Sequence, residues 1–309
     1  MAAPTHIFAE IPAWVYKVML LSAAAIWGLS FITMKDAVGI MPPAYLIGVR
    51  FLATGVILAL VFQKRLRAHF NKQHLAAGAT LGVFLFLGFW VQTIGLADTT
   101  PGKNAFLTAS YCVLVPFFFW LIMRKRPSVY NVIAAALCIG GIGLVSLQGS
   151  LAIGFGDFMT LVSAIFFAIH IVYVSKLSQK NDILVMTVYQ FLVGGACGML
   201  MGASFEVWPA ASAFTLDFFW DMAYIVIFAS CVALVFQNVG LAHMPPAQGA
   251  LFLSLESVFG VAFSVMLYGE ELSLQLIFGF LLIFVAIVVS ETFPLKEVPW
   301  HRKKVTSSS

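Results

Sequence analysis

Long apolar stretches, separated by short polar or proline- and glycine-rich joints, make up most of this chain. Each stretch is close to the roughly twenty residues that an α-helix needs to cross a bilayer. Lipid offers no hydrogen-bond partners to backbone groups, so stretches of this length form helices rather than strands. The pattern predicts an all-α integral membrane protein with ten transmembrane helices, near residues 16–35, 43–63, 75–97, 103–123, 128–147, 156–176, 183–203, 217–242, 246–267 and 273–293.

Composition supports the membrane assignment and limits the partners. Hydrophobic residues are 61% of the 309 and charged residues are 10%, against roughly 45–50% and about 25% in soluble domains. The net charge of +4 does not indicate a nucleic-acid partner, because the Lys and Arg residues lie in loops beside the spans. The four cysteines lie in apolar runs without CxxC spacing, which is typical of small hydrophobic residues. We expect the lipid bilayer and a small-molecule solute as partners, no cofactor and no metal, and a monomer or homodimer.

The positive charges predict the orientation. With the N-terminus in the cytoplasm, fourteen of the seventeen Lys and Arg residues lie on the inner side, and only Lys35, Arg50 and Lys103 lie in or beyond the outer half. Cytoplasmic loops of membrane proteins carry such an excess of positive residues. We therefore expect a multi-pass protein of the plasma membrane (a bacterial inner membrane), with both termini in the cytoplasm.

The chain contains an internal repeat. A block of fourteen residues that begins at Gln92 recurs at Gln237, and six of its fourteen positions are identical at a constant offset of 145. Each copy lies in a half with five predicted spans, and an odd number of spans gives the two halves opposite orientations. Many secondary transporters build their binding site between such inverted repeats. The sequence thus predicts two repeats of five helices each, residues 15–148 and residues 155–294.

Short motifs recur along nearly the whole chain, from about residue 15 to 293. They are Trp27-Gly28, Arg50, Gly95-Leu96 followed by Pro101 and Ala105, Ser254-Leu255-Glu256, and Gly269-Glu270 followed by Leu272-Ser273. Together they resemble the EamA-type, ten-span branch of the drug/metabolite transporter superfamily. One departure is Ser257, which stands where that family often has Pro. The resemblance implies two EamA-type repeats, a central cavity between them, and transport of a small organic solute such as an amino acid, sugar, nucleotide or drug.

Glu256 is the clearest candidate for a functional charge. It follows the start of the ninth predicted span by ten residues, which places it about 15 Å deep at roughly 1.5 Å per residue, near the midplane. An acid at this depth costs roughly 2.5–3.5 kcal/mol on insertion scales and usually faces a cavity or a partner. Glu256 could couple protons, balance a cationic group of the solute, or tether neighbouring helices through Ser254, Ser257 or another span.

A polar face in the fourth predicted span indicates one wall of the cavity. Asn104, Thr108 and Tyr111 are spaced by four and three residues, so they share a helix face. Tyr111 occupies the repeat position equivalent to Glu256, at the same offset of 145. A polar face in lipid must turn inward, so we expect it to line the interior, either in contact with the solute or packed between helices.

A second polar face, in the sixth predicted span, carries Ser163, His170 and Tyr173. A titrating His170 could relay protons, or a neutral His170 could bond a neighbouring helix. No second His lies within four residues of it, so the pattern does not indicate a metal site.

Arg50 lies about 10 Å below the outer surface, at roughly 1.5 Å per residue. Its planar guanidinium could bind a solute carboxylate, or it could tie loop carbonyls or Asp98 together. Trp27 and Trp90 could stack on a solute or fill space. Gln92 and Gln237, which are equivalent positions of the repeat, could bond helices together at the pseudo-twofold axis. The full set of candidate solute-binding residues is Trp27, Ser30, Arg50, Trp90, Asn104, Thr108, Tyr111, Ser163, His170, Tyr173, Gln237 and Glu256.

The leading functional hypothesis is a secondary transporter that exports an amino-acid-like or amphipathic metabolite by alternating access, with the proton as candidate coupling ion. The chain contains no Walker-type glycine-rich loop that would indicate ATP-driven transport. The alternative is a passive channel or facilitator, or a non-transporting receptor. A pore is expected to show rings of charge or a polar lining, and the interior polar residues here are few. A membrane-embedded enzyme is the least supported class, because the six His are scattered along the chain.

Overall fold

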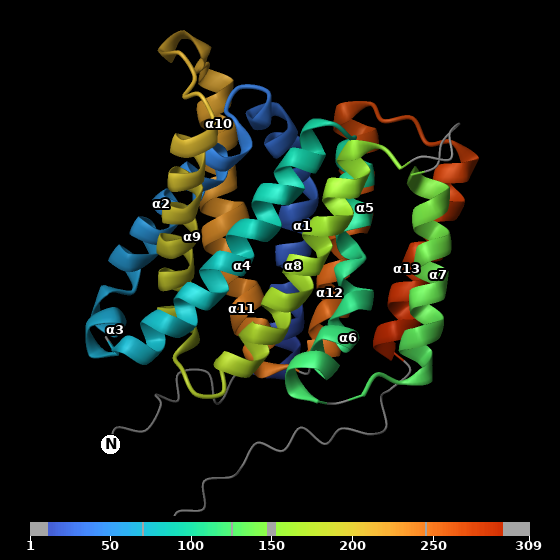
Figure 1. Cartoon of the computed structure of the whole chain (residues 1–309), viewed down its shortest axis with the longest axis horizontal. Coiled ribbons are helices and arrows are strands. Elements are labelled where there is room, and N and C mark those ends of the chain that lie inside the picture. Colours follow the sequence, from blue (N-terminus) through green and yellow to red (C-terminus); the bar gives the residue numbers. More distant parts are fainter. Residues whose placement is uncertain (1–11, 70, 125, 147–152, 245, 293–309) are drawn as a thin grey trace, which may run out of the picture.

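The computed structural model describes residues 12–69, 71–124, 126–146, 153–244 and 246–292 (Figure 1). Within these ranges the chain is a bundle of helices without strands, as the sequence predicts. Both termini and the predicted repeat ends at 148 and 294 lie outside the described residues. The first repeat contains α1 (Ala13–Val38), α2 (Pro43–Val61), the short α3 (Gln63–Ala68), α4 (Lys72–Ala97), α5 (Pro101–Ala109), α6 (Tyr111–Met123) and α7 (Val129–Ser146).

The second repeat repeats this order. It contains α8 (Phe155–Leu177), α9 (Ile183–Phe205), η1 (Ala211–Ala213), α10 (Leu216–Tyr224), η2 (Ile225–Val232), α11 (Ala233–His243), α12 (Pro246–Phe263), η3 (Ser264–Tyr268) and α13 (Leu274–Thr292). Nine helical runs in the described ranges are long and apolar enough to cross a membrane, and α13 adds the apolar stretch Leu274–Ser290. The predicted ten spans of a multi-pass membrane protein are therefore confirmed.

The packing of the helices is symmetric, because its main contacts are kept when each span is exchanged for its counterpart in the other repeat. The second spans, α2 and α9, pack against each other, and so do the fifth spans, α7 and α13. The third span of each repeat also packs against the first span of the other repeat, as the contacts of α4 with α8 and of α11 with α1 show. Figure 1 shows α2 with α9 at one edge of the bundle and α7 with α13 at the other. The remaining spans lie between these two pairs and are the ones that can enclose a central site.

Glycines let α2 and α9 approach closely. A Cβ atom on Gly48 would lie 2.7 Å from the backbone nitrogen of Met199, and one on Gly198 would lie 2.6 Å from the Cα of Gly48. Close backbone approach of this kind is how helices associate in lipid, where apolar burial gives little driving force.

Three of the ten spans depart from a single regular helix. The fourth span is divided at Ser110 into α5 and α6, and the eighth and ninth spans contain the π-helical segments η2 and η3. The hydrophobic pattern predicts these spans as unbroken, because apolar composition does not distinguish an α-helix from a π-helix. The break at Ser110 and the π-helical segment η2 lie beside the central cavity described below.

Carboxylates join the repeats at the end of the bundle that the charge distribution predicts to be outside, hereafter the outer end. Glu206, which follows α9, accepts hydrogen bonds from the backbone nitrogens of Ala44 (2.9 Å) and Tyr45 (3.0 Å) at the start of α2. Asp98, at the end of α4, accepts one from the backbone nitrogen of Gly156 (3.1 Å) at the start of α8. In both cases an acid of one repeat satisfies free N–H groups at a helix N-terminus of the other.

A third carboxylate, Glu270, makes the same kind of contact. It accepts hydrogen bonds from the backbone nitrogen of Gly102 (3.0 Å), near the start of α5, from the Thr100 hydroxyl, and from the Ser264 hydroxyl (2.5 Å). A side chain on Gly102 would collide with this carboxylate. Glu270 of the second repeat thus fastens α5 of the first repeat.

The opposite end of the bundle has a different cross-repeat contact. Arg65, in α3, forms a salt bridge of 2.6 Å with Asp182, the N-cap of α9. The Nε2 atom of His74 also accepts a hydrogen bond from the backbone nitrogen of Asp182 (3.0 Å). Both ends of the bundle are therefore closed by polar contacts between the repeats.

Candidate functional site

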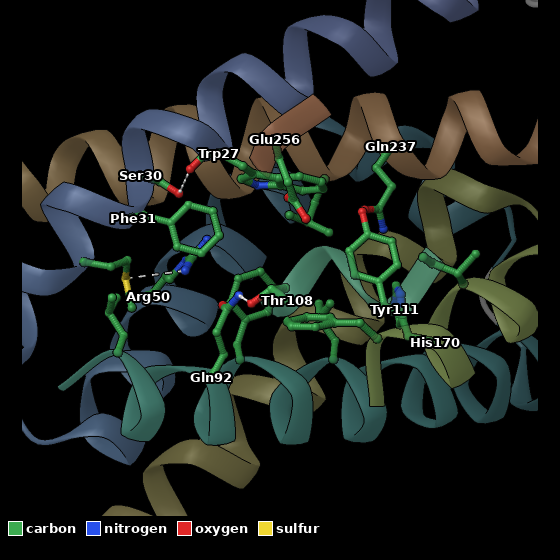
Figure 2. A pocket seen from close by; sticks show the side chains of 17 residues that line it. Trp27, Ser30, Phe31, Arg50, Gln92, Thr108, Tyr111, His170, Gln237 and Glu256 are labelled. Carbon is green, nitrogen blue, oxygen red and sulfur yellow. Dashed lines mark hydrogen bonds between the residues drawn. The ribbon is translucent and has the colours of Figure 1, made fainter. Parts of the chain in front are cut away.

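A cavity that mixes polar and aromatic side chains lies between the repeats (Figure 2). Its volume is about 40 Å³, room for about three water molecules at roughly 10–15 Å³ each. A larger solute can enter only when the helices that form the wall move apart. The wall consists of Trp27, Ser30, Phe31, Met34, Arg50, Leu85, Phe89, Gln92, Leu96, Thr108, Tyr111, Phe167, His170, Ile171, Leu234, Gln237 and Glu256.

An arginine and a glutamate, residues able to carry opposite charges, line this cavity without forming an ion pair. Among the described residues Arg65 and Asp182 form a salt bridge, whereas neither Arg50 nor Glu256 takes part in one. Figure 2 shows Arg50 at one end of the cavity, with Glu256 pointing into its middle. Buried ionisable groups are normally paired or hydrogen-bonded, so two such groups without an ion pair in a single cavity are an exception.

Arg50 is 1% exposed and is held by neutral groups. Its Nε donates to the Ser230 hydroxyl (2.6 Å), its Nη2 lies 3.5 Å from the Ala229 carbonyl, and its Nη1 lies 3.6 Å from the Met34 sulfur. The guanidinium carbon lies 4.5 Å from the centre of the Phe89 ring, close enough for a cation–π interaction. A guanidinium has five N–H donors, so donors remain for an acceptor in the cavity.

Glu256 is 5% exposed and lies on α12 at mid-span. Its carboxyl group interacts with the hydroxyl of Tyr111, its repeat-equivalent residue. Its Oε1 atom has no hydrogen-bond partner among the described residues. The hydroxyls of Ser254 and Ser257 donate to carbonyls within α12, so neither serine tethers Glu256.

Three further polar side chains of the wall are fixed by hydrogen bonds. Gln92 on α4 donates to the Thr108 hydroxyl on α5 (2.9 Å). His170 on α8 lies 3.3 Å from the amide oxygen of Gln190 on α9. His170 thus contacts a neighbouring helix, as one of the two roles considered for it requires.

Eight of the twelve predicted site residues line the cavity, and four do not. Trp90 stacks on Phe86, with ring centres 5.7 Å apart, and Tyr173 stacks on Phe84 at 5.5 Å. Both residues lie off the helix faces that carry the cavity residues, so their side chains contact neighbouring aromatic rings instead. Asn104 donates to the Thr160 hydroxyl (2.7 Å), and Ser163 donates to the carbonyl of Thr160 (2.6 Å). The eight residues that do line the cavity are Trp27, Ser30, Arg50, Thr108, Tyr111, His170, Gln237 and Glu256.

The alternative role considered for Arg50, tying loop carbonyls or Asp98 together, is wrong. Lys35 binds the loop instead, and donates to the carbonyls of Leu96 (2.8 Å), Ala97 (3.0 Å) and Thr99 (2.9 Å). Arg50 cannot reach this loop because its side chain faces the eighth span.

The sequence did not point to the apolar part of the wall. Leu85, Phe89 and Leu96 lie on α4 at spacings that put them on one face with Gln92. That periodicity was available in the sequence, but 30 phenylalanines and many leucines hide it among lipid-facing residues. Within the described part of the chain, no three His, Cys, Asp or Glu side chains come together as a metal ion would require.

The repeats correspond to a known family unit. Residues 15–147 and residues 154–292 each match the EamA-like transporter family. The chain belongs to this family. Two matches that together span nearly the whole sequence confirm the resemblance drawn from the short motifs, and they make the protein a membrane transporter of the drug/metabolite transporter type.

Individual relatives agree with the family. An uncharacterized transporter of Archaeoglobus fulgidus is 29% identical over 86% of this chain and 82% of its own length. YoaV, an uncharacterized transporter of Bacillus subtilis, is 25% identical over 91% of this chain and 99% of its own. YedA, an uncharacterized inner membrane transporter of Escherichia coli, is 22% identical over 80% of this chain and 81% of its own length. One solved crystal structure shares the fold, with a TM-score of 0.66 at 17% identity over 89% of this chain and 96% of that one.

Proposed function

We propose that this EamA-family protein is a secondary transporter that exports an amino-acid-like or otherwise amphipathic solute by alternating access. The observation that carries the proposal is the pair Arg50 and Glu256. They line one cavity between the two repeats, can carry opposite charges, and have no salt bridge to a described residue. A solute that brings both an anionic and a cationic group satisfies both.

The contacts of Arg50 and Glu256 support a different role for each of them in binding such a solute. The guanidinium of Arg50 keeps free N–H donors toward the cavity, and its planar fork suits a carboxylate. The Glu256 carboxyl group, with Oε1 free of protein partners, suits an ammonium group. Trp27, Phe31 and Phe89 supply apolar walls between these two charges. The narrow volume of the cavity favours a site that closes around the solute over an open channel.

Competition at Glu256 supplies the energy coupling. An ammonium group and a proton both neutralise the same carboxylate, so one binds when the other leaves. Such a carrier exchanges solute for protons. Where the proton gradient points inward, the exchanged solute moves outward, which is the reason to expect export.

The inverted repeats support alternating access. In carriers of this design, one conformation becomes the other when the repeats exchange roles around a fixed midplane site. Here each end of the bundle is closed by its own contacts, Glu206, Asp98 and Glu270 at the outer end and Arg65 with Asp182 at the other. Opening one set while the other persists would expose the cavity to one side at a time.

Counterflow in proteoliposomes tests the proposal. Each radiolabelled L-amino acid is offered outside vesicles that contain the same unlabelled amino acid, and in parallel outside empty vesicles. Preloading should accelerate uptake of at least one amino acid, and Arg50→Gln should abolish that uptake. Arg67→Gln, on the exposed surface of α3, is the matched control and should transport normally.

Two results would contradict the proposal. Uptake that does not depend on preloading identifies a pore rather than a carrier. Amino-acid counterflow that survives Arg50→Gln removes Arg50 from the binding site.

A further inference from the structure

The eighth span contains a π-helical segment at the depth of the cavity. η2 covers Ile225–Val232 between α10 and α11. The equivalent span of the first repeat, α4, is an unbroken α-helix over Lys72–Ala97. The segment is therefore a local feature of the second repeat and not a consequence of the shared fold. π-helical turns are rare, and they occur frequently at functional sites.

Two consecutive residues of η2 hold cavity residues of the other repeat. The Ser230 hydroxyl accepts a hydrogen bond from Nε of Arg50 (2.6 Å) and donates one to the carbonyl of Ile225 (2.9 Å). The Ala229 carbonyl accepts a hydrogen bond from the indole nitrogen of Trp27 (2.8 Å) and lies 3.5 Å from Nη2 of Arg50. Ser230 is fully buried, so its hydroxyl is not exposed to bulk solvent.

These contacts orient the guanidinium group. Ser230 and the Ala229 carbonyl take the edge formed by Nε and Nη2. The Phe89 ring, 4.5 Å from the guanidinium carbon, covers one face. The edge formed by Nη1 and Nη2 is left with the Met34 sulfur at 3.6 Å, which is a weak acceptor. That edge is the one that can bind a carboxylate with two parallel hydrogen bonds.

We propose that Ser230 is a positioning residue of the solute site. It fixes the Arg50 fork so that the edge formed by Nη1 and Nη2 faces the cavity, and thereby determines the affinity for the carboxylate of the solute. This inference rests on the proposed function, in which Arg50 binds that carboxylate. Removal of the Ser230 hydroxyl leaves Nε–H buried without its acceptor, and the guanidinium turns to find another one.

Binding to purified protein tests the inference with two probes of the same shape. The twenty L-amino acids are measured against their L-amino acid amides, which lack the carboxylate. Ser230→Ala should lower the affinity for the acid roughly tenfold, the loss of one hydrogen bond to a charged group, and leave the affinity for the amide unchanged. Ser230→Thr keeps the hydroxyl and should restore the affinity for the acid. Ser175→Ala, equally buried but on α8 and away from the cavity wall, is the matched control.

A second readout does not need a ligand. The Nε–H of Arg50 gives a side-chain NMR signal in protein labelled with ¹⁵N-arginine, and its hydrogen exchange should be faster in Ser230→Ala than in Ser230→Thr or the wild type. Ser230→Ala would overturn the positioning role if it lowered the affinities for the amino acids and their amides equally. An unchanged hydrogen-exchange rate at Nε–H of Arg50 would overturn it as well. Wild-type protein that binds neither probe contradicts the proposed solute class instead, and the exchange measurement then decides the role of Ser230 by itself.

Discussion

Tyr111 and Glu256 occupy equivalent positions of the two repeats, and their side chains interact inside the cavity. Residues related by a twofold axis can touch only where they lie close to that axis. The contact therefore places the axis of the inverted repeats at the cavity itself, where carriers of this design bind their solute. The two repeats have the same fold here but different chemistry, because one contributes a neutral hydroxyl and the other an acid. The acid alone can exchange a proton for a cation.

Replacement of Glu256 should separate coupling from binding. We expect Glu256→Gln to abolish solute movement driven by a pH gradient in proteoliposomes, because an amide cannot release a proton. Solute exchange between loaded vesicles should continue. Tyr111→Phe, which removes only the hydroxyl opposite, is the comparison and should keep its response to pH. A Glu256→Gln variant with the pH response of the wild type would exclude Glu256 as the coupling residue.

Loss of the Glu270 carboxylate should favour opening at the outer end. Glu270→Gln weakens the hydrogen bonds to Gly102, Thr100 and Ser264, and charge-assisted bonds of this kind are worth roughly 1.5–3 kcal/mol each. A cysteine at Ser30, in the cavity wall of a chain without its native cysteines, should then react about tenfold faster with an impermeant reagent added outside. Glu271→Gln, on the exposed neighbouring residue, is the control. Equal labelling rates in the two variants would show that Glu270 does not hold the outer end closed.

The crossing of α1 and α12 should not tolerate a side chain at Gly28. A Cβ atom there would lie 2.9 Å from the backbone nitrogen of Gly260 and would collide with the Cβ of Phe259. We expect Gly28→Ala to destabilise the protein by about 1–3 kcal/mol, measured as a lower midpoint of thermal unfolding in detergent. Gly154→Ala is the control, because nothing lies within 4 Å of its added Cβ atom. An unchanged midpoint for Gly28→Ala would mean that the two helices can separate without cost.

Cysteine labelling should report the predicted orientation in the membrane. Cysteines introduced at Lys64 and Lys180, both exposed, should react with an impermeant reagent only from the cytoplasmic side. Cysteines at Ser212 and Glu271, also exposed, should react only from outside. Lys64 and Lys180 on opposite sides of the membrane would contradict the orientation and the even number of spans between them.

Much of the site could be predicted because lipid imposes strong rules on a sequence. Polar residues in a span must turn inward, so Thr108, Tyr111, His170 and Glu256 could be placed at the interior from spacing alone. Trp90 and Tyr173 could not, since aromatic side chains are stable both in lipid and in a packed interior. In the structure they stack on the neighbouring rings of Phe86 and Phe84 instead.

The sequence by itself determined the ten spans, the inverted repeat and the acid near the midplane, because these follow from length, periodicity and the cost of charge in lipid. Only the tertiary structure decided the partners of Arg50. Its contacts with Ser230 and Ala229 join residues about 180 positions apart along the chain, and they depend on a π-helical turn that shares its composition with any apolar helix. Which groups meet across a helix interface is set by how the helices pack, and a single chain read in order carries no direct record of that packing.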